Sequence, residues 1–272
     1  MPRRPTKLCP MNDLVEWIAG HALPLWAVLL VLACLAGDAA WQWNRRQHEA
    51  ALRDSREPIV LRGRTAAGLL VASALLFAAI ALAVAVEAHS WLSGFDLALA
   101  QDLSEQMQPP ALRLVAAVSH LGDLGSVAAA AVLVLAVLLW RRQLHLATCW
   151  TIALAGIVPL NSGLKALFQR PRPLHSHGFI VEHGWSFPSG HAFGAIVFYG
   201  MLAYVLLRLL PHRWHRLVVA VAVAMVSVIG LSRIVLQVHY FSDVIAGYAS
   251  GSAWLVLCIA GSEYWRGRTK DA

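Results

Sequence analysis

Two residues with catalytic chemistry lie four positions apart in the segment Ser232-Arg233-Ile-Val-Leu-Gln-Val-His239-Tyr-Phe-Ser-Asp243. If the backbone around His239 is helical, Asp243 lies one turn further on the same face, where its carboxylate can hold the imidazole Nδ1–H. The opposite ring nitrogen is then left as a nucleophile or a base, as in catalytic triads. A structural hydrogen bond or half of a metal site would use the same pair.

A second candidate segment comes directly before an apolar run and reads Ser186-Phe187-Pro188-Ser189-Gly190-His191. Ser189 suits the N-cap of a helix, and Gly190 permits close approach, so the free N–H groups of the first turn can bind an anion such as phosphate. His191 then lies beside that anion. Taken alone, the segment is also consistent with an ordinary serine cap and an incidental histidine.

A third candidate segment follows another apolar run and carries the cations Lys165, Arg170 and Arg172. Pro171 and Pro173 favour extended backbone in the residues before them, which holds Arg172 in a defined direction. Lys165 lies at a membrane boundary, where its charge must reach the interface or meet an anion. On its own this segment is typical of a helix end whose charges snorkel to the interface.

The elements that position these residues are membrane helices. Of the 272 residues, 58% are hydrophobic and 14% charged, against about 25% charged in soluble domains. Seven stretches contain no Asp, Glu, Lys or Arg: 22–37, 66–86, 124–140, 146–164, 192–207, 217–232 and 244–262. With flanking residues, each approaches the roughly 20 residues of a spanning helix. We therefore expect an all-α polytopic membrane protein, and a water-soluble enzyme is excluded.

The basic residues are distributed unevenly between the two sides of this predicted helix bundle. With alternating loops, 14 of the 22 Lys and Arg fall on one side and eight on the other. The positive-inside rule makes the first side cytoplasmic, so the three candidate segments face the outside. The net charge of +7 is scattered between apolar runs, which argues against nucleic-acid binding. The bilayer is therefore an expected partner.

On this topology the three segments can meet at one mouth of the bundle. Together they supply three cations (Lys165, Arg172 and Arg233), a helix N-terminus and two histidines. Fixed positive donors stabilise the charge that spreads over the oxygens in phosphoryl transfer. One histidine can attack phosphorus while another protonates the departing oxygen. This set of residues is sufficient for phosphoryl transfer without a metal.

At these positions the sequence resembles the type 2 phosphatidic acid phosphatase superfamily, whose pattern is Lys-x6-Arg-Pro, Pro-Ser-Gly-His and Ser-Arg-x5-His-x3-Asp. All eleven fixed positions agree: Lys165, Arg172, Pro173, Pro188, Ser189, Gly190, His191, Ser232, Arg233, His239 and Asp243. The resemblance covers residues 66–262 and implies a six-helix transmembrane phosphatase core. Residues 1–65 are then an N-terminal appendage with one apolar helix and an arginine-rich cytoplasmic loop, and residues 263–272 are a cytoplasmic tail.

The resemblance also implies a role for each of these residues. His239 would be the nucleophile that forms a phosphohistidine, Asp243 would orient it, and His191 would protonate the leaving group and then deprotonate water. The phosphate would be bound by Lys165, Arg172, Ser189, Gly190 and Arg233. Neither a metal nor a cofactor is expected.

The expected function is therefore that of a membrane lipid phosphatase that hydrolyses a phosphate monoester or diphosphate. Its candidate substrates are phosphatidic acid, phosphatidylglycerol phosphate, undecaprenyl diphosphate and lipid A phosphate, among which the motifs do not choose. The 19 Arg against three Lys fit a GC-rich bacterial gene, and hence an inner-membrane protein with a site facing the periplasm. The alternatives are a phosphotransferase that uses the same phosphohistidine and a non-catalytic transporter of lipid head groups.

Two further segments carry patterns that predict structure or function. His175, His177 and His183 with Glu182 could form a metal site, although polar loop residues near a substrate mouth explain them better. Phe95, Leu99, Leu103 and Met107 recur every four residues in a polar stretch, which predicts an amphipathic helix that ends before Pro109-Pro110. We expect this helix to be an interfacial connector, with a mobile lid as the alternative.

Overall fold

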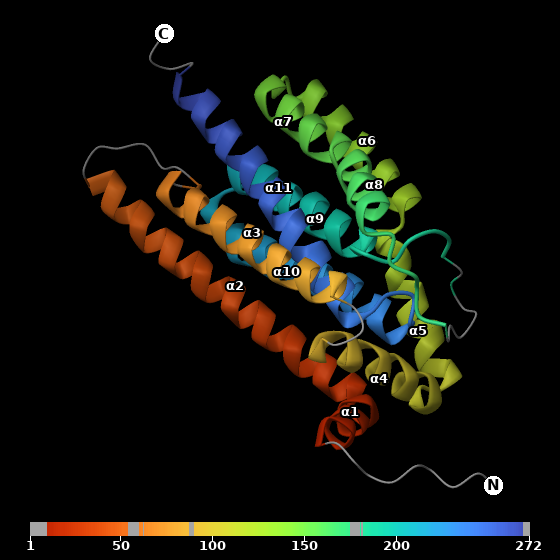
Figure 1. Cartoon of the computed structure of the whole chain (residues 1–272). Coiled ribbons are helices and arrows are strands. Elements are labelled where there is room, and N and C mark those ends of the chain that lie inside the picture. The colour runs from red at the N-terminus through yellow and green to blue at the C-terminus, as the bar shows by residue number, and fades with distance from the viewer. Residues whose placement is uncertain are drawn as a thin grey trace, which may run out of the picture.

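The computed structural model describes residues 10–53, 60–61, 63–86, 90–174, 180 and 182–268 (Figure 1). Over these residues the chain forms helices and no strands. The helices are α1 (Pro10–Gly20), α2 (Ala22–Arg53), α3 (Gly63–Ala85), α4 (Trp91–Gln106), α5 (Pro109–Ser119), η2 (His120–Gly122), α6 (Leu124–Trp140), α7 (Leu144–Ala155), α8 (Ile157–Phe168), α9 (Gly190–Leu209), η3 (His212–Trp214), α10 (His215–Val235) and α11 (Phe241–Arg268).

Six helical segments are long and apolar enough to cross a membrane. They are Ala22–Trp43, Gly63–Ala85, Leu144–Phe168, Gly190–Leu209, His212–Val235 and Phe241–Gly267. A seventh crossing is possible if Pro109–Gly122 and Leu124–Trp140, which meet at a bend of 42°, count as one span. These segments contain the seven predicted apolar runs except for residue 86, so the predicted all-α polytopic membrane fold is confirmed.

Helices α9, α10 and α11 form the centre of the bundle. Helix α9 packs against both of the others, while α3 packs on α11 and α2 on α10 (Figure 1). Two glycines let α11 pass very close to the start of α9. A Cβ at Gly247 would lie 2.6 Å from the carbonyl oxygen of Ser189, and one at Gly251 would lie 2.9 Å from that of Phe193. This close crossing fixes the N-terminal ends of α9 and α11 beside each other.

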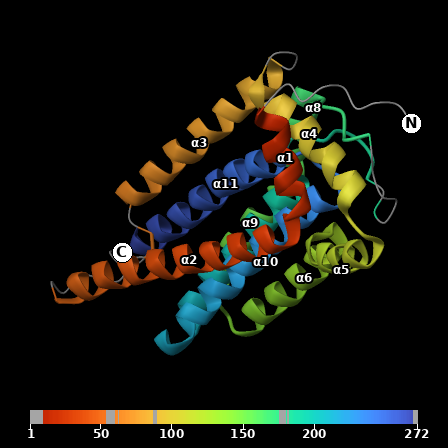
Figure 2. The ribbon, with the colours of Figure 1, turned by 90° about the horizontal axis from the view of Figure 1, so that it is seen from below.

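The N-terminal helices pack on the rest of the bundle. Helix α1 lies against α4, and α2 runs along α10 (Figure 2). Arg216 at the start of α10 holds Asp38 of α2 through an ion pair of 2.7 Å. The apolar run 22–37 is thus part of a single long helix, and the domain boundary near residue 65 remains a prediction.

The predicted amphipathic helix is present as α4. Ser90 caps its first turn, and the helix buries Phe95, Leu99 and Leu103 in a cluster that includes Val15 of α1. The helix ends at Gln106, and Pro109 begins α5. Asp96 is buried too, which the sequence pattern did not predict, and its contacts lead into the candidate active site.

Candidate active site

His239 lies in the turn between α10 and α11. The backbone there is not helical, because α10 ends at Val235 and Gln237 adopts a positive φ of 55°. Asp243 instead belongs to the first turn of α11, and its Oδ2 lies 3.4 Å from His239 Nδ1. The backbone N–H of Tyr240 donates to the same oxygen at 2.9 Å. A tight turn, and not the assumed helix, therefore brings the carboxylate to the imidazole.

The ring of His239 is buried and neutral. Burial lowers the pKa of His239 to about 3, although Asp243 favours the charged form. Ser186 donates to Asp243 and lies 3.3 Å from His239 Nδ1, so this hydroxyl supports both groups. His239 Nε2 lies 3.2 Å from Nη1 of Arg172. Nε2, the ring nitrogen that faces away from Asp243, thus faces the guanidinium of Arg172.

Arg170 holds Asp243 from the other side. Its Nη1 donates to Asp243 Oδ1 at 2.7 Å, and its Nη2 donates to Asp96 at 2.9 Å. Ser242 donates to Asp96 through both its N–H and its hydroxyl. The Arg170 guanidinium also lies over the ring of Tyr240, 4.3 Å from its centroid. Buried ion pairs need such added hydrogen bonds to offset desolvation, so this network fixes the carboxylate that faces His239.

Two further arginines converge on the same centre. Arg172 donates to the backbone carbonyls of Val238 at 2.7 Å and Gly184 at 3.1 Å, which directs its guanidinium toward His239. Arg233 is fully buried and donates to Ser119 Oγ at 2.6 Å. Within the described part of the chain, Arg233 Nε is a buried donor without a hydrogen-bond partner. A buried donor of this kind suits a further acceptor from a ligand.

The carboxylate of Glu182 lies between these cations. It accepts a hydrogen bond from Arg233, and it lies 3.8 Å from Nη2 of Arg172 and 3.9 Å from Nδ1 of His191. Burial opposes ionisation of this carboxyl, but the charges of Arg233, His191 and Arg172 together hold the pKa of Glu182 below its usual value. The centre of the cluster is therefore an anion-binding position, and a side chain of the protein occupies it.

His191 lies in the first turn of α9. Ser189 is the N-cap and accepts from the N–H of Ala192 at 3.5 Å, while its own N–H donates to the Asp243 carbonyl at 2.9 Å. The N-cap prediction is thus confirmed. His191 Nε2 lies 2.9 Å from Asp123 Oδ1, at the turn before α6.

The remaining candidates lie around this centre. Lys165 is in the last turn of α8, and its Nζ donates to the Trp185 carbonyl at 2.6 Å. Gly190 begins α9, where a Cβ would lie 3.0 Å from Oδ1 of Asn161. His175 and His177 lie outside the described residues, so the loop metal site proposed with them stays untested. The described residues contain no group of three or more His, Cys, Asp or Glu side chains that could hold a metal.

The structure thus brings His239, Asp243, Arg172, Arg233 and His191 around one position, with Lys165, Ser189 and Gly190 at its edge. Five supporting residues stand outside the fixed positions of the family pattern, namely Asp96, Ser119, Asp123, Arg170 and Ser186. Arg170 and Ser186 lie within the candidate segments of the sequence, whereas Asp96, Ser119 and Asp123 lie outside them. Asp123 carries one usable signal, because it directly precedes an apolar run on the predicted outer side. Asp96 carries none, since an acidic residue in a polar stretch looks solvent-exposed.

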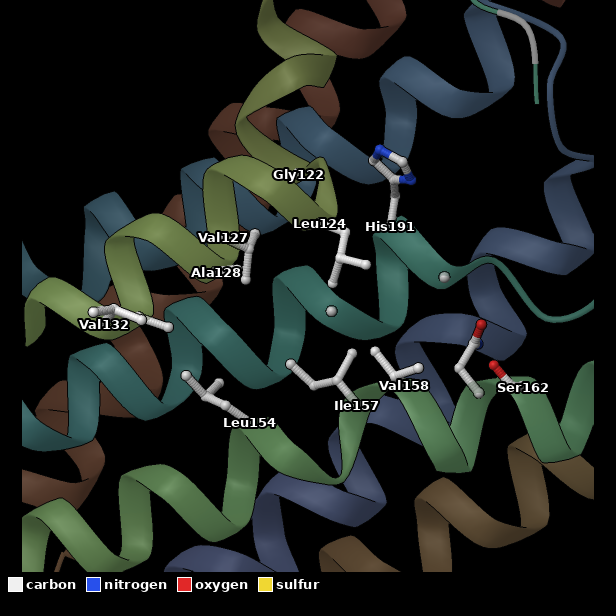
Figure 3. Close-up of a pocket in the computed structure, with 14 residues that line it drawn as sticks. Gly122, Leu124, Val127, Ala128, Val132, Leu154, Ile157, Val158, Ser162 and His191 are labelled. Carbon is white, nitrogen blue, oxygen red and sulfur yellow. The ribbon is translucent and has the colours of Figure 1, made fainter. Parts of the chain in front are cut away.

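An apolar groove of about 400 Å³ opens beside His191 (Figure 3). It lies between α6, α8 and α9, with His191, Asn161 and Ser162 as its polar residues. The rest of its lining is apolar or glycine, including Leu124, Val127, Ala128, Val132, Leu154, Ile157 and Val158.

The chain is similar to known proteins in sequence and in fold. Phosphatidylglycerophosphatase B of Bacillus subtilis (strain 168) is 35% identical over 94 residues, which are 34% of this chain and 46% of that protein. The match therefore spans less than half the length of that relative. The fold is similar to the crystal structure of a transmembrane PAP2 type phosphatidylglycerolphosphate phosphatase from Bacillus subtilis, with a TM-score of 0.67 and 25% identity. That similarity covers 72% of this chain and 96% of the other.

The family model for the PAP2 superfamily matches residues 144–266. This range contains the predicted nucleophile His239, the acid–base candidate His191 and both arginines of the cluster, Arg172 and Arg233. Over this segment, which is a little under half of the chain, the sequence is thus similar to the PAP2 superfamily.

Proposed function

We propose that the protein is a membrane lipid phosphatase that hydrolyses a lipid phosphate monoester or diphosphate. The observation that carries the proposal is the convergence of Arg172, Arg233, His191 and His239 on one partly buried position that holds the Glu182 carboxylate. A phosphate group bears the same charge sign and offers more acceptor oxygens than a carboxylate. The names of the similar proteins, both phosphatases of a phosphorylated lipid, support this reading.

A bound phosphate would take the place of Glu182. Its oxygens would accept from Arg172 and Arg233, including the Arg233 Nε that has no partner within the described residues. The N–H of Gly190, at the start of α9, adds a backbone donor at a helix N-terminus. Lys165 and the N-cap Ser189 complete the proposed binding set. These donors would stabilise the charge of the transferring phosphoryl group.

The proposed reaction has two steps. In the first, His239 Nε2 bonds to phosphorus while the bond to the leaving oxygen breaks, and that oxygen takes a proton from His191 Nδ1. In the second, a water oxygen bonds to phosphorus, the N–P bond breaks and the water proton returns to His191. Asp243 orients His239 throughout and stabilises the positive charge on its ring. No cofactor enters either step.

The groove beside His191 supports a lipid substrate. An acyl chain lying along Leu124, Val127 and Val158 would place its head group beside His191, which lines the same groove (Figure 3). Burial of apolar surface contributes about 25 cal/mol per Å², so a chain of this kind adds affinity that a soluble phosphate ester lacks. The groove fits an acyl or prenyl chain alike, and phosphatidylglycerol phosphate is the first candidate from the similar proteins.

The proposed setting is the inner membrane of a bacterium, with the site facing the periplasm. This orientation follows from the excess of Lys and Arg in the opposite loops, with 14 against eight. In a cysteine-free background, a cysteine at position 184 should react with an impermeant maleimide added to intact cells. A cysteine at position 142 should react only after the cells are opened, and the reverse pattern would refute the orientation.

The function is tested with the purified protein in detergent. Phosphate release is measured from phosphatidylglycerol phosphate, phosphatidic acid, undecaprenyl diphosphate and lipid A phosphate, with and without a chelator. We expect release from at least one lipid, unaffected by chelator and lost in His239→Ala. Head-group binding without phosphate release would favour a transporter, and transfer of labelled phosphate to an acceptor lipid would favour a phosphotransferase.

A further inference from the structure

We propose that Asp123 is the positioning residue of His191 and does for the acid–base histidine what Asp243 does for the nucleophile. The inference rests on the proposed phosphatase function. Asp123 occupies the turn between η2 and α6, and its Oδ1 lies 2.9 Å from His191 Nε2. The site would then contain two imidazole–carboxylate pairs, supplied by different parts of the chain.

The hydrogen bond to Asp123 fixes which nitrogen of His191 can exchange a proton. An ionised carboxylate only accepts hydrogen bonds, so His191 Nε2 must carry the hydrogen. The other nitrogen, Nδ1, faces the anion-binding position, 3.9 Å from the Glu182 carboxylate. In the charged ring Nδ1–H is the acid for the leaving oxygen, and in the neutral ring the Nδ1 lone pair is the base for water. One orientation thus serves both steps, as in other carboxylate–histidine pairs.

The turn that carries Asp123 is pressed against the imidazole. A Cβ at Gly122 would lie 2.9 Å from Cδ2 of His191 and 2.6 Å from Cγ2 of Ile229. Only glycine allows this approach, because any other residue would push the turn away from the ring. Gly122 therefore sets the distance at which Asp123 meets His191.

Two further hydrogen bonds hold the turn in place. His120 Nδ1 lies 2.7 Å from Asp123 Oδ2, so each oxygen of the carboxylate meets one imidazole. The Tyr199 hydroxyl donates to the Leu121 carbonyl at 3.2 Å, which ties the turn to α9. Since α9 also carries His191, the carboxylate and its partner ring are anchored to one helix.

The charged groups that face His191 are Asp123, Glu182 and Arg233. When phosphate replaces Glu182, the carboxylate of Asp123 still contacts the imidazole of His191. Through both chemical steps the Nε2–H bond to Asp123 persists, and the proton that moves is the one on Nδ1. Asp123 itself gains no proton, so its role is to orient the ring and to stabilise its charged form.

The test compares two substrates that differ in their need for an acid. Phosphatidic acid releases an alkoxide that must be protonated, whereas 4-nitrophenyl phosphate releases a stable phenolate. In Asp123→Asn and Asp123→Ala we expect kcat/KM for phosphatidic acid to fall by up to the 10²–10⁴-fold typical of general acid catalysis. For 4-nitrophenyl phosphate we expect a fall of less than about tenfold, because kcat/KM reports only the first step. His191→Ala should show the same pattern.

The matched control is Glu105→Gln, which removes an exposed carboxylate of α4 and should leave both values unchanged. Asp123→Asn preserves the side-chain shape if Asp123→Ala fails to fold. An equal loss on both substrates, or no loss on either, would overturn the role of Asp123. A wild-type protein that releases phosphate from none of the four lipids named above would instead refute the proposed function. A His191→Ala pattern that the Asp123 variants do not share would refute this inference alone.

Discussion

Replacing Glu182 should tighten phosphate binding. Its carboxylate accepts from Arg233 and lies within 3.9 Å of both Arg172 and His191, on the donors assigned to the phosphate. A phosphate can bind there only after this carboxylate has left. The wild-type protein therefore loses one charge-assisted contact for each phosphate that it binds. In Glu182→Ala and Glu182→Gln that loss is absent or reduced.

The size of the effect follows from the contact that is lost. A hydrogen bond to a charged group contributes about 1.5–3 kcal/mol, and every 1.4 kcal/mol is tenfold in affinity. We therefore expect the inhibition constant for inorganic phosphate to fall by about tenfold to a hundredfold in Glu182→Ala. Glu182→Gln should show a smaller fall, because its amide oxygen can still accept from Arg233. Glu182→Ala should also melt at a lower temperature without phosphate, since Arg233 then stays buried without a carboxylate partner.

The assay is competitive inhibition of lipid phosphate hydrolysis by inorganic phosphate, with Glu105→Gln as the control for removal of an exposed carboxylate. An inhibition constant that is unchanged or higher in Glu182→Ala would refute the reasoning. It would show that the carboxylate and the phosphate do not compete for the same donors.

Three other predictions concern the network, the groove and the nucleophile. Arg170→Met should lower the free energy of unfolding by about 3–5 kcal/mol, because it leaves Asp243 and Asp96 buried without their cation. Thermal melting in detergent checks this prediction, and an unchanged melting temperature would contradict it. Val158→Trp should raise KM for a long-chain lipid phosphate more than KM for a short-chain one. The difference should be about tenfold for each 1.4 kcal/mol of lost apolar contact. Equal changes in the two KM values would argue against binding of the lipid chain in this groove. His239 should stay neutral from about pH 8 to about pH 5, because burial lowers its pKa from 6.5 to about 3. In nitrogen NMR of histidine-labelled protein, the His239 signal, assigned with His239→Gln, should show no titration over this range. A titration midpoint near 6.5 would contradict the prediction.

Much of the fold follows from the sequence alone, because long apolar segments that lie in a lipid bilayer are helical. The stretches without charge, such as 66–86 and 244–262, had to become helices because backbone polar groups in a bilayer must be satisfied internally. The repeat of Phe95, Leu99 and Leu103 likewise predicted α4. The packing of α2 on the bundle was not predictable, because the apolar run 22–37 carries little information about which face of the helix meets which neighbour.

The candidate site likewise contains residues that the sequence predicts and residues that it does not. The proposed phosphate ligands and both histidines stand in motifs with fixed spacing, so local sequence pointed to them. Asp96 and Asp123 lie 74 and 68 residues along the chain from Arg170 and His191, and only the folded bundle brings them together. Glu182 is close in sequence to Arg172 and His191, but 51 residues from Arg233. Even Asp243 reached His239 for a different reason than expected, since the backbone at His239 is a tight turn. Sequence spacing thus identified the reacting groups and Asp243, whereas the contacts of Asp96 and Asp123 depend on tertiary packing.

The most direct test of the account is a covalent phosphate on His239. His191→Ala, mixed with 4-nitrophenyl phosphate and quenched in alkali, should accumulate a phosphoenzyme because phenolate leaves without an acid while hydrolysis lacks its base. Mass spectrometry of the digested protein should place the phosphate on His239 in an acid-labile bond, with none in the His191→Ala/His239→Ala double variant. Rapid turnover with no phosphoenzyme at all, or a phosphate attached to any other residue, would contradict the account.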